Sequence, residues 1–206
     1  GLKLLRAILR VELAGETTLS TGETRTVQRA LALIETMIHG GTLDKRRTTA
    51  GLLDFFRNRA WRDGGFVQGG IANDPNAPDV WVPALEPRAV DANTWGVAAL
   101  GARQVDAWFG NGAAYHAWRQ VQGWGAYGLG PTLWGVGYSN QDGNGIGADG
   151  AYRQGILSAE WTAGAITMVR NMLRHYRVVA AGGDPAARNY VERLEADERA
   201  MLAGVQ

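Results

Sequence analysis

Two acidic residues stand where helices are expected to begin, and each has a tryptophan nearby. Asp91 precedes a helical stretch that contains Trp95, and Glu160 is followed directly by Trp161. Two carboxyl groups in one site can divide the work of a general acid and a general base. Tryptophan offers such a site a large flat apolar face with one N–H donor. The pattern therefore predicts acid and base chemistry on a ring-shaped ligand, with Asp91 and Glu160 as the reacting pair.

Both carboxyl groups also have a plain structural explanation. Asp91 can be the N-cap of its helix, and an acid in the first turn, such as Glu160, interacts favourably with the helix dipole; each effect contributes about 0.5–2 kcal/mol. A helix N-terminus stabilises a charged carboxylate, whereas a general acid must hold its proton. An apolar wall is needed to offset this effect, and Trp161 and Tyr138 are candidates for it beside Glu160.

The centre of the chain is rich in tryptophan and glycine. All eight tryptophans and 19 of the 29 glycines lie between residues 61 and 161. Glycine allows a backbone to approach a ligand closely, so the combination is typical of loops that line an aromatic groove, although about half of the tryptophans are expected in the core. The polar residues beside the aromatics are equally typical of turns. The residues expected to contact the ligand are Trp81, Trp95, Trp134, Trp161, Tyr138, Gln68, Asn93 and Asp142.

Composition and charge exclude several classes of function. The 21 basic and 20 acidic residues leave a formal net charge of +1. Because no basic cluster is interleaved with aromatic residues, nucleic acid is not expected as a partner. The absence of cysteine excludes disulfides, thiol catalysis and cysteine-ligated zinc. No apolar run approaches the roughly 18 residues that are needed to cross a bilayer, so no transmembrane segment is expected.

No metal and no cofactor are expected either. The run from Asp142 to Arg153 half-matches a calcium-binding loop, but Ile146 and Arg153 stand at two positions where the loop requires oxygen ligands. The three histidines lack the spacing of a metal site. The glycine-rich segment also lacks the lysine and hydroxyl residue of a phosphate-binding loop, which excludes a nucleotide site of that kind.

Helices are expected on both sides of this centre, because apolar residues recur there with helical spacing. In the helix after Ser158, one apolar stripe is expected to contain Trp161, Ala165, Val169, Met172 and Tyr176. Capping and stop signals, including Gly101, Ser158 and the pair Asp184 and Pro185, mark where helices begin or end. The expected helices span residues 2–14, about 20–39, 48–61, 92–100, about 111–122, 159–181 and 185 onward. No convincing run of alternating residues indicates strands. We therefore predict an all-α fold of helical hairpins with long loops at one end, forming a single domain over residues 1–206.

Three segments resemble a known superfamily. The segments AVDANTWGVAALG (89–101), LWGVGYSNQDG (133–143) and ILSAEWTAGAITMVR (156–170) resemble the glycosidase-like (α/α) toroid proteins of bacteria. The resemblance covers mainly residues 61–180 and implies the C-terminal part of an incomplete six-hairpin toroid, whose inner helices point their N-terminal ends into a polysaccharide cleft. It implies a glycoside hydrolase, with Glu160 as the acid and Asp91 as the base or nucleophile, and inversion is the favoured outcome.

Two other functions stay open beside the hydrolase. One is a non-catalytic carbohydrate-binding or structural subunit of a larger assembly, since a fold-level resemblance does not establish activity. The other is a polysaccharide lyase with Tyr138 or His116 as base and an arginine that neutralises a uronate, although the balanced charge weighs against a polyanion cleft. The expected partner in each is a polysaccharide or oligosaccharide. A secreted or periplasmic location is favoured over the cytoplasm.

Overall fold

A computed structural model of the chain describes residues 45–71 and 81–204. The internal contacts divide the chain after Phe55 into two units. The described part of the first unit is one helix, α3 (Lys45–Phe55). The helices that were expected over residues 2–14 and 20–39 lie outside the described residues. The sites below all belong to the second unit, which begins at Phe56.

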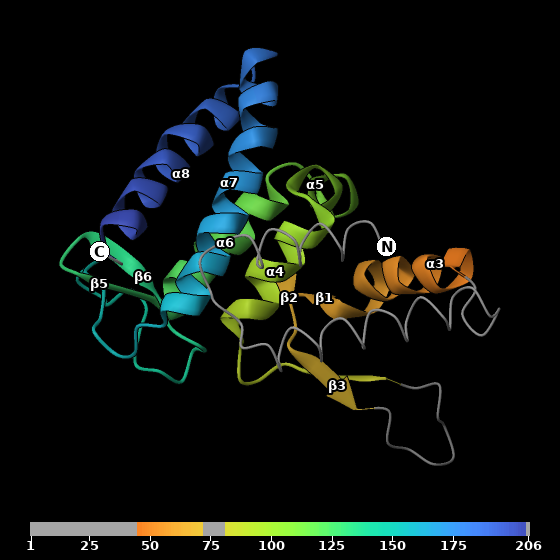
Figure 1. The fold of residues 1–206 in the computed structure, drawn as a ribbon, viewed down its shortest axis with the longest axis horizontal. Coiled ribbons are helices and arrows are strands. Elements are labelled where there is room, and N and C mark those ends of the chain that lie inside the picture. The colour runs from red at the N-terminus through yellow and green to blue at the C-terminus, as the bar shows by residue number, and fades with distance from the viewer. Residues whose placement is uncertain (1–44, 72–80, 205–206) are drawn as a thin grey trace, which may run out of the picture. The chain divides into compact units, whose positions relative to one another are not determined.

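The second unit combines helices with short hairpins (Figure 1). A single π-helical turn (Phe56–Ala60) leads into two small hairpins, which are followed by a run of helices, a third hairpin and two long helices. The helices are α4 (Val90–Leu100), α5 (Ala102–Phe109), α6 (Ala113–Gly125), α7 (Ala159–Ala181) and α8 (Pro185–Gly204). The strands are β1 (Trp61–Arg62), β2 (Gly65–Phe66), β3 (Gly69–Ile71), β4 (Val82–Ala84), β5 (Ala126–Leu129) and β6 (Thr132–Val136).

The expectation of an all-α toroid is wrong. In the described residues, three two-stranded antiparallel sheets, β1–β2, β3–β4 and β5–β6, stand beside the helices. These strands were not predicted from the sequence, because they are two to five residues long and do not alternate cleanly between apolar and polar residues. In the longest, β6, Leu133, Gly135 and Val136 are all buried. The fold is therefore a mixed one.

Several helix ends follow the prediction, whereas others differ. Ser158 caps α7 by accepting a hydrogen bond from the Trp161 N–H, and Asp184 Oδ1 accepts from the N–H groups of Ala186 and Ala187 at the start of α8. The helix α5, which lies between two positive-φ glycines, was missed. The helix predicted over residues 48–61 ends at Phe55, and Trp61 belongs to a strand instead.

The helix α7 forms the centre of the core. Its predicted apolar stripe is confirmed for the four residues Ala165, Val169, Met172 and Tyr176, which are all at most 2% exposed, while Trp161 is half-buried. The neighbouring helix α8 adds fully buried leucine and methionine side chains, and α6 adds Trp118. Each fully buried side chain of this size contributes about 1.5–3 kcal/mol. Burial along α7 therefore supports the helices that hold the sites.

The helices α4 and α7 run in the same direction and lie side by side (Figure 1). A Cβ atom at Gly164 would lie 3.3 Å from both the Thr94 and the Trp95 side chains. Further along both helices, Asn171 Nδ2 donates to the Ala98 carbonyl at 3.5 Å. The residue numbers increase along both helices from the first contact to the second, so the two helices run parallel and begin at the same end. The missing side chain of Gly164 permits this close approach.

The end of β6 joins both helix starts. The Val90 N–H donates to the Tyr138 carbonyl at 2.9 Å, and the Ser158 N–H donates to the Val136 carbonyl at 2.9 Å. The Thr162 hydroxyl, one turn into α7, accepts from the Val136 N–H at 3.1 Å. The β5–β6 hairpin therefore aligns the first turns of α4 and α7.

Candidate functional site

The structure brings Asp91 and Glu160 into neighbouring first turns. Asp91 is half-buried, and its Oδ1 accepts the Ala92 N–H at 2.7 Å. The N-cap of α4 is Ala89, so the expectation of an N-cap at Asp91 is wrong by two residues. Glu160 is exposed in the first turn of α7. Two carboxyl groups therefore stand at the same end of the unit, with Asp91 oriented by backbone and Glu160 open to solvent.

Three aromatic side chains accompany this pair. The Tyr138 and Trp161 rings pack edge to face, with centroids 4.7 Å apart and planes at 77°. Trp95 lies over Gly164, which is one helical turn beyond Glu160. Trp95 is 38% exposed and Tyr138 is 43% exposed, so much of this aromatic surface is accessible. We call Asp91, Glu160, Trp95, Tyr138 and Trp161 the helix-start cluster.

The loop after β6 is held by two inward-turned polar side chains. Asp142 Oδ2 accepts the N–H groups of Tyr138 and Ser139, which fixes the backbone that carries the Tyr138 ring. The buried Asn144 amide donates to the carbonyls of Gly125 and Ile156 and accepts the N–H groups of Gly155 and Ile156. Asp142, a predicted ligand contact, thus positions Tyr138, one member of the helix-start cluster. The role of Asn144 could not be predicted, because its hydrogen-bond partners lie 11 to 19 residues away in the chain.

In the structure, the segment that half-matches a calcium-binding loop uses its polar side chains to hold its own backbone. Its residues Asp142 and Asn144 are engaged with backbone groups of the loop. Across residues 45–71 and 81–204, no group of three or more acidic or histidine side chains has the arrangement of a metal site.

Four other predicted contacts lie elsewhere. Trp134 packs against Gly204 at the end of α8, and Trp81 covers Gly70 in the β3–β4 hairpin. Asn93 is 5% exposed and binds both the N–H and the carbonyl of Phe66, so its amide holds β2 against α4. Gln68 is exposed at the edge of a separate cavity. The structure does not bring Trp81 or Trp134 to the helix-start cluster.

The tryptophans are less buried than expected. Of the eight, all of which lie within the described residues, Trp118 is the one that is fully buried. Trp61 stacks on Phe109 at 4.2 Å with nearly parallel planes, and it meets Phe66 edge to face. These rings attach the β1–β2 hairpin to α5. The size of the indole explains the result, since tryptophan is highly but seldom completely buried.

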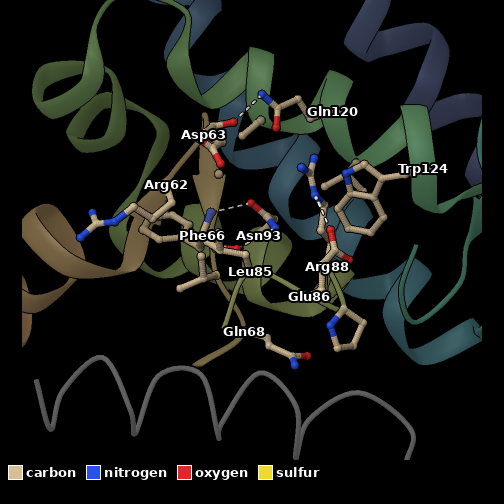
Figure 2. Close-up of a pocket in the computed structure, with 15 residues that line it drawn as sticks. Arg62, Asp63, Phe66, Gln68, Leu85, Glu86, Arg88, Asn93, Gln120 and Trp124 are labelled. Carbon is tan, nitrogen blue, oxygen red and sulfur yellow. Dashed lines mark hydrogen bonds and ion pairs between the residues drawn. The ribbon is translucent and has the colours of Figure 1, made fainter. Parts of the chain in front are cut away.

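A cavity of about 250 Å³ lies between the β1–β2 turn, the segment before α4, and α6 (Figure 2). Two of its lining residues, Gln68 and Asn93, are among the predicted ligand contacts. The others could not be predicted, because they come from three separate segments, 62–67, 85–88 and 117–124, that carry no common pattern. Its remaining lining includes Arg62, Asp63, Phe66, Leu85, Glu86, Pro87, Arg88, Gln120 and Trp124.

A second group that the sequence did not reveal surrounds Asp106 on α5. Asp106 is 8% exposed and accepts the N–H groups of Gly112 and Ala114 at 3.2 and 2.9 Å. The Tyr176 hydroxyl donates to it at 3.2 Å, and His175 Nε2 lies 3.2 Å from its Oδ2. Burial and the neighbouring Asp106 carboxylate raise the pKa of Tyr176. This network ties α5, α6 and α7 together.

Another carboxylate, Asp197, joins α8 to α6. Its Oδ2 accepts Trp118 Nε1 at 2.8 Å and Gln122 Nε2 at 2.9 Å. Burial raises the pKa of Asp197, and the hydrogen bonds and nearby Arg119 oppose that rise. Like Asp106, this residue supports the packing of helices.

No family model, curated protein or solved structure matches the chain. The resemblance to toroid proteins therefore depends on the segments 89–101, 133–143 and 156–170 alone. Within the part of the chain that the structure describes, no helix is long and apolar enough to span a membrane.

Proposed function

We propose that this chain is a carbohydrate-active protein that binds a glycan at the helix-start cluster and hydrolyses it with Asp91 and Glu160. The observation that carries the proposal is the parallel arrangement of α4 and α7, which puts both carboxyl groups in adjacent first turns. Aromatic side chains on both helices and at the end of β6 offer faces for sugar rings. Most glycoside hydrolases use a pair of carboxyl groups that flank the scissile bond of the sugar.

The two carboxyl groups suit different roles. The Ala92 N–H donates to Asp91 Oδ1, which orients this carboxylate and stabilises its negative charge, as a base that activates water requires. Glu160 is open to solvent, so a bound sugar stacked beside Trp161 would shield it from water. Shielding favours the protonated form that a general acid needs. We assign Glu160 as acid and Asp91 as base, with inversion of the anomeric carbon.

A binding protein without hydrolysis is the second candidate, and the exposure of Glu160 favours it. In the free protein, the Tyr138 and Trp161 rings pack on each other, and Glu160 remains exposed. Exposed aromatic faces can stack against sugar rings without any catalytic step. In this case Asp91 and Glu160 contribute hydrogen bonds to sugar hydroxyl groups and no proton transfer.

The test measures reducing ends released from a panel of neutral and acidic glucans. Hydrolysis predicts release by the wild type and a loss of at least about 100-fold in Glu160→Gln and in Asp91→Asn, which retain hydrogen-bonding groups. Glu192→Gln, an exposed change on α8, is the matched control and should keep full activity. NMR of the first product would show the inverted anomer.

The same panel of glucans distinguishes a binding protein from a hydrolase. A binding protein releases no reducing ends, shows saturable quenching of tryptophan fluorescence by an oligosaccharide, and keeps its affinity in Glu160→Gln. Loss of that quenching in Trp161→Leu would place the glycan on the helix-start cluster. Neither release nor quenching with any glycan would overturn both candidates.

A further inference from the structure

We propose that the cavity in Figure 2 binds a single small ring that carries one carboxylate, with Arg88 as the carboxylate-binding residue and Trp124 as the face for the ring. Asp91 and Glu160 are not among the lining residues of this cavity. The proposal is therefore independent of the hydrolysis proposed above.

The backbone of Arg88 is held firmly in place. Its N–H donates to Asn140 Oδ1 at 2.8 Å, and its carbonyl accepts the Asn140 N–H at 3.1 Å. Asn140 Nδ2 donates in turn to Glu86 Oε2 at 2.7 Å. One asparagine thus orients both charged residues on this wall of the cavity. Such prior positioning lowers the conformational entropy that the protein loses when a ligand binds.

The guanidinium of Arg88 keeps two donors for a ligand. Its Nε lies 3.5 Å from Glu86 Oε1, while the other Glu86 oxygen is bound by Asn140. Within the described residues, Nη1 and Nη2 of Arg88 make no hydrogen bond to the protein. Two parallel N–H groups on a planar guanidinium match the two oxygens of a carboxylate.

Apolar walls flank this donor pair. Phe66, Leu85, Pro87 and Trp124 line the cavity, and Figure 2 shows the Trp124 indole next to Arg88. A volume of about 250 Å³ is slightly below the usual range of small-molecule sites, which suits one ring rather than an extended chain. An aromatic face together with an arginine therefore favours a flat or ring-shaped acid.

The amides of the cavity add polar contacts. Gln120 Nε2 donates to the Asp63 carbonyl at 2.9 Å, which leaves its Oε1 as an acceptor for a ligand hydroxyl. Gln68 is exposed at the rim. Asn93 adds nothing here, because its amide is occupied by the Phe66 backbone. A uronic acid and an aromatic carboxylate are two sources of the same ring-plus-carboxylate chemistry.

Arg62 also lines the cavity but provides a matched control. Its guanidinium donates to the Trp61 carbonyl at 2.7 Å and to the Asn58 carbonyl at 3.3 Å. In Figure 2 it points away from Trp124. Arg62→Gln therefore removes the same charge from the same neighbourhood without removing the proposed carboxylate contact.

The experiment is calorimetric titration of the full chain at low salt with glucuronate and benzoate, and with glucose and benzyl alcohol as neutral counterparts. At least one acid should bind about tenfold or more tightly than its neutral counterpart, and Arg88→Gln should remove that preference while Arg62→Gln retains it. Trp124→Phe should keep the affinity within a few-fold and abolish the ligand-induced change in tryptophan fluorescence.

Preferential binding of glucuronate would indicate a uronic acid as the ligand, and preferential binding of benzoate would indicate an aromatic carboxylate. Equal affinities for acids and neutral counterparts in the wild type, or no binding of either acid, would overturn the proposal without reference to any variant. An acid preference that persists in folded Arg88→Gln, as judged by circular dichroism, would do the same. The affinity should be unchanged in Glu160→Gln, which separates this site from the proposed hydrolysis.

Discussion

Asp91 and Asp106 lie on consecutive helices, yet the protein surrounds their carboxylates in different ways. Asp106 is buried and is contacted by two backbone N–H groups, a phenol and an imidazole. Asp91 is half-buried and has one hydrogen bond from the adjacent backbone, and Glu160 on α7 is exposed. Carboxylate oxygens that the protein itself satisfies stabilise the fold, whereas those left open can meet a ligand.

The aromatic residues of the two regions also differ in their exposure to solvent. Around Asp106, the rings of Tyr115 and Tyr190 stack at 4.0 Å, and Tyr176 is 2% exposed. At the helix-start cluster, Tyr138 is 43% exposed. A buried phenol that donates to a carboxylate supports packing, whereas exposed aromatic faces that lie together form a candidate binding surface.

The largest effect is expected for Asp106→Ala. This change removes the acceptor of the buried Gly112 and Ala114 N–H groups, so the free energy of unfolding should fall by about 3 kcal/mol or more. Glu160→Ala should change it by no more than about 0.5 kcal/mol. Urea denaturation of both variants measures the contrast, and equal losses would show that the two carboxylates do not differ in structural role.

A smaller effect is expected where α4 and α7 cross. Gly164→Ala would place a Cβ 3.3 Å from Thr94 and Trp95, and the required shift should cost about 1 kcal/mol after the better helix propensity of alanine is included. Gly123→Ala on α6 is the control, because nothing lies within 4 Å of its Cβ, and it should stabilise by about 0.5 kcal/mol. Thermal unfolding of both variants measures this difference; stabilisation in both would contradict the close packing.

The smallest effect is a pH dependence at Asp197. Because burial raises the pKa of Asp197 above its ordinary value, its contribution to stability is complete below the unfolded pKa and is lost as pH rises through the folded pKa. Relative to Asp197→Asn, the wild type should therefore lose stability as the pH rises from about 4, near the ordinary pKa of an aspartate, toward neutral pH. Urea denaturation across that range measures the difference. A constant difference between wild type and variant would show that Asp197 is not perturbed in this way.

Helix ends could be predicted where the signal is local. Ser158 caps α7, Asp184 binds the first N–H groups of α8, and Gly101 ends α4, as their residue types indicated. The helix α5 escaped prediction because the closely spaced Gly101 and Gly110 interrupt the helical pattern on both sides. The β5–β6 hairpin was not predicted because its strands are four and five residues long and mix apolar residues with glycine, so no run of alternating residue types marks them.

The sequence by itself determined the helix caps and stops, the apolar stripe of α7 and the presence of carboxyl groups in two first turns, because each depends on residues within a few positions of one another. The tertiary structure alone decided that α4 and α7 begin side by side, that Asp106 and Asp197 are engaged while Glu160 is open, and that Arg88 and Trp124 line one cavity. These depend on contacts between residues tens of positions apart, where packing at one glycine or one hairpin sets the outcome.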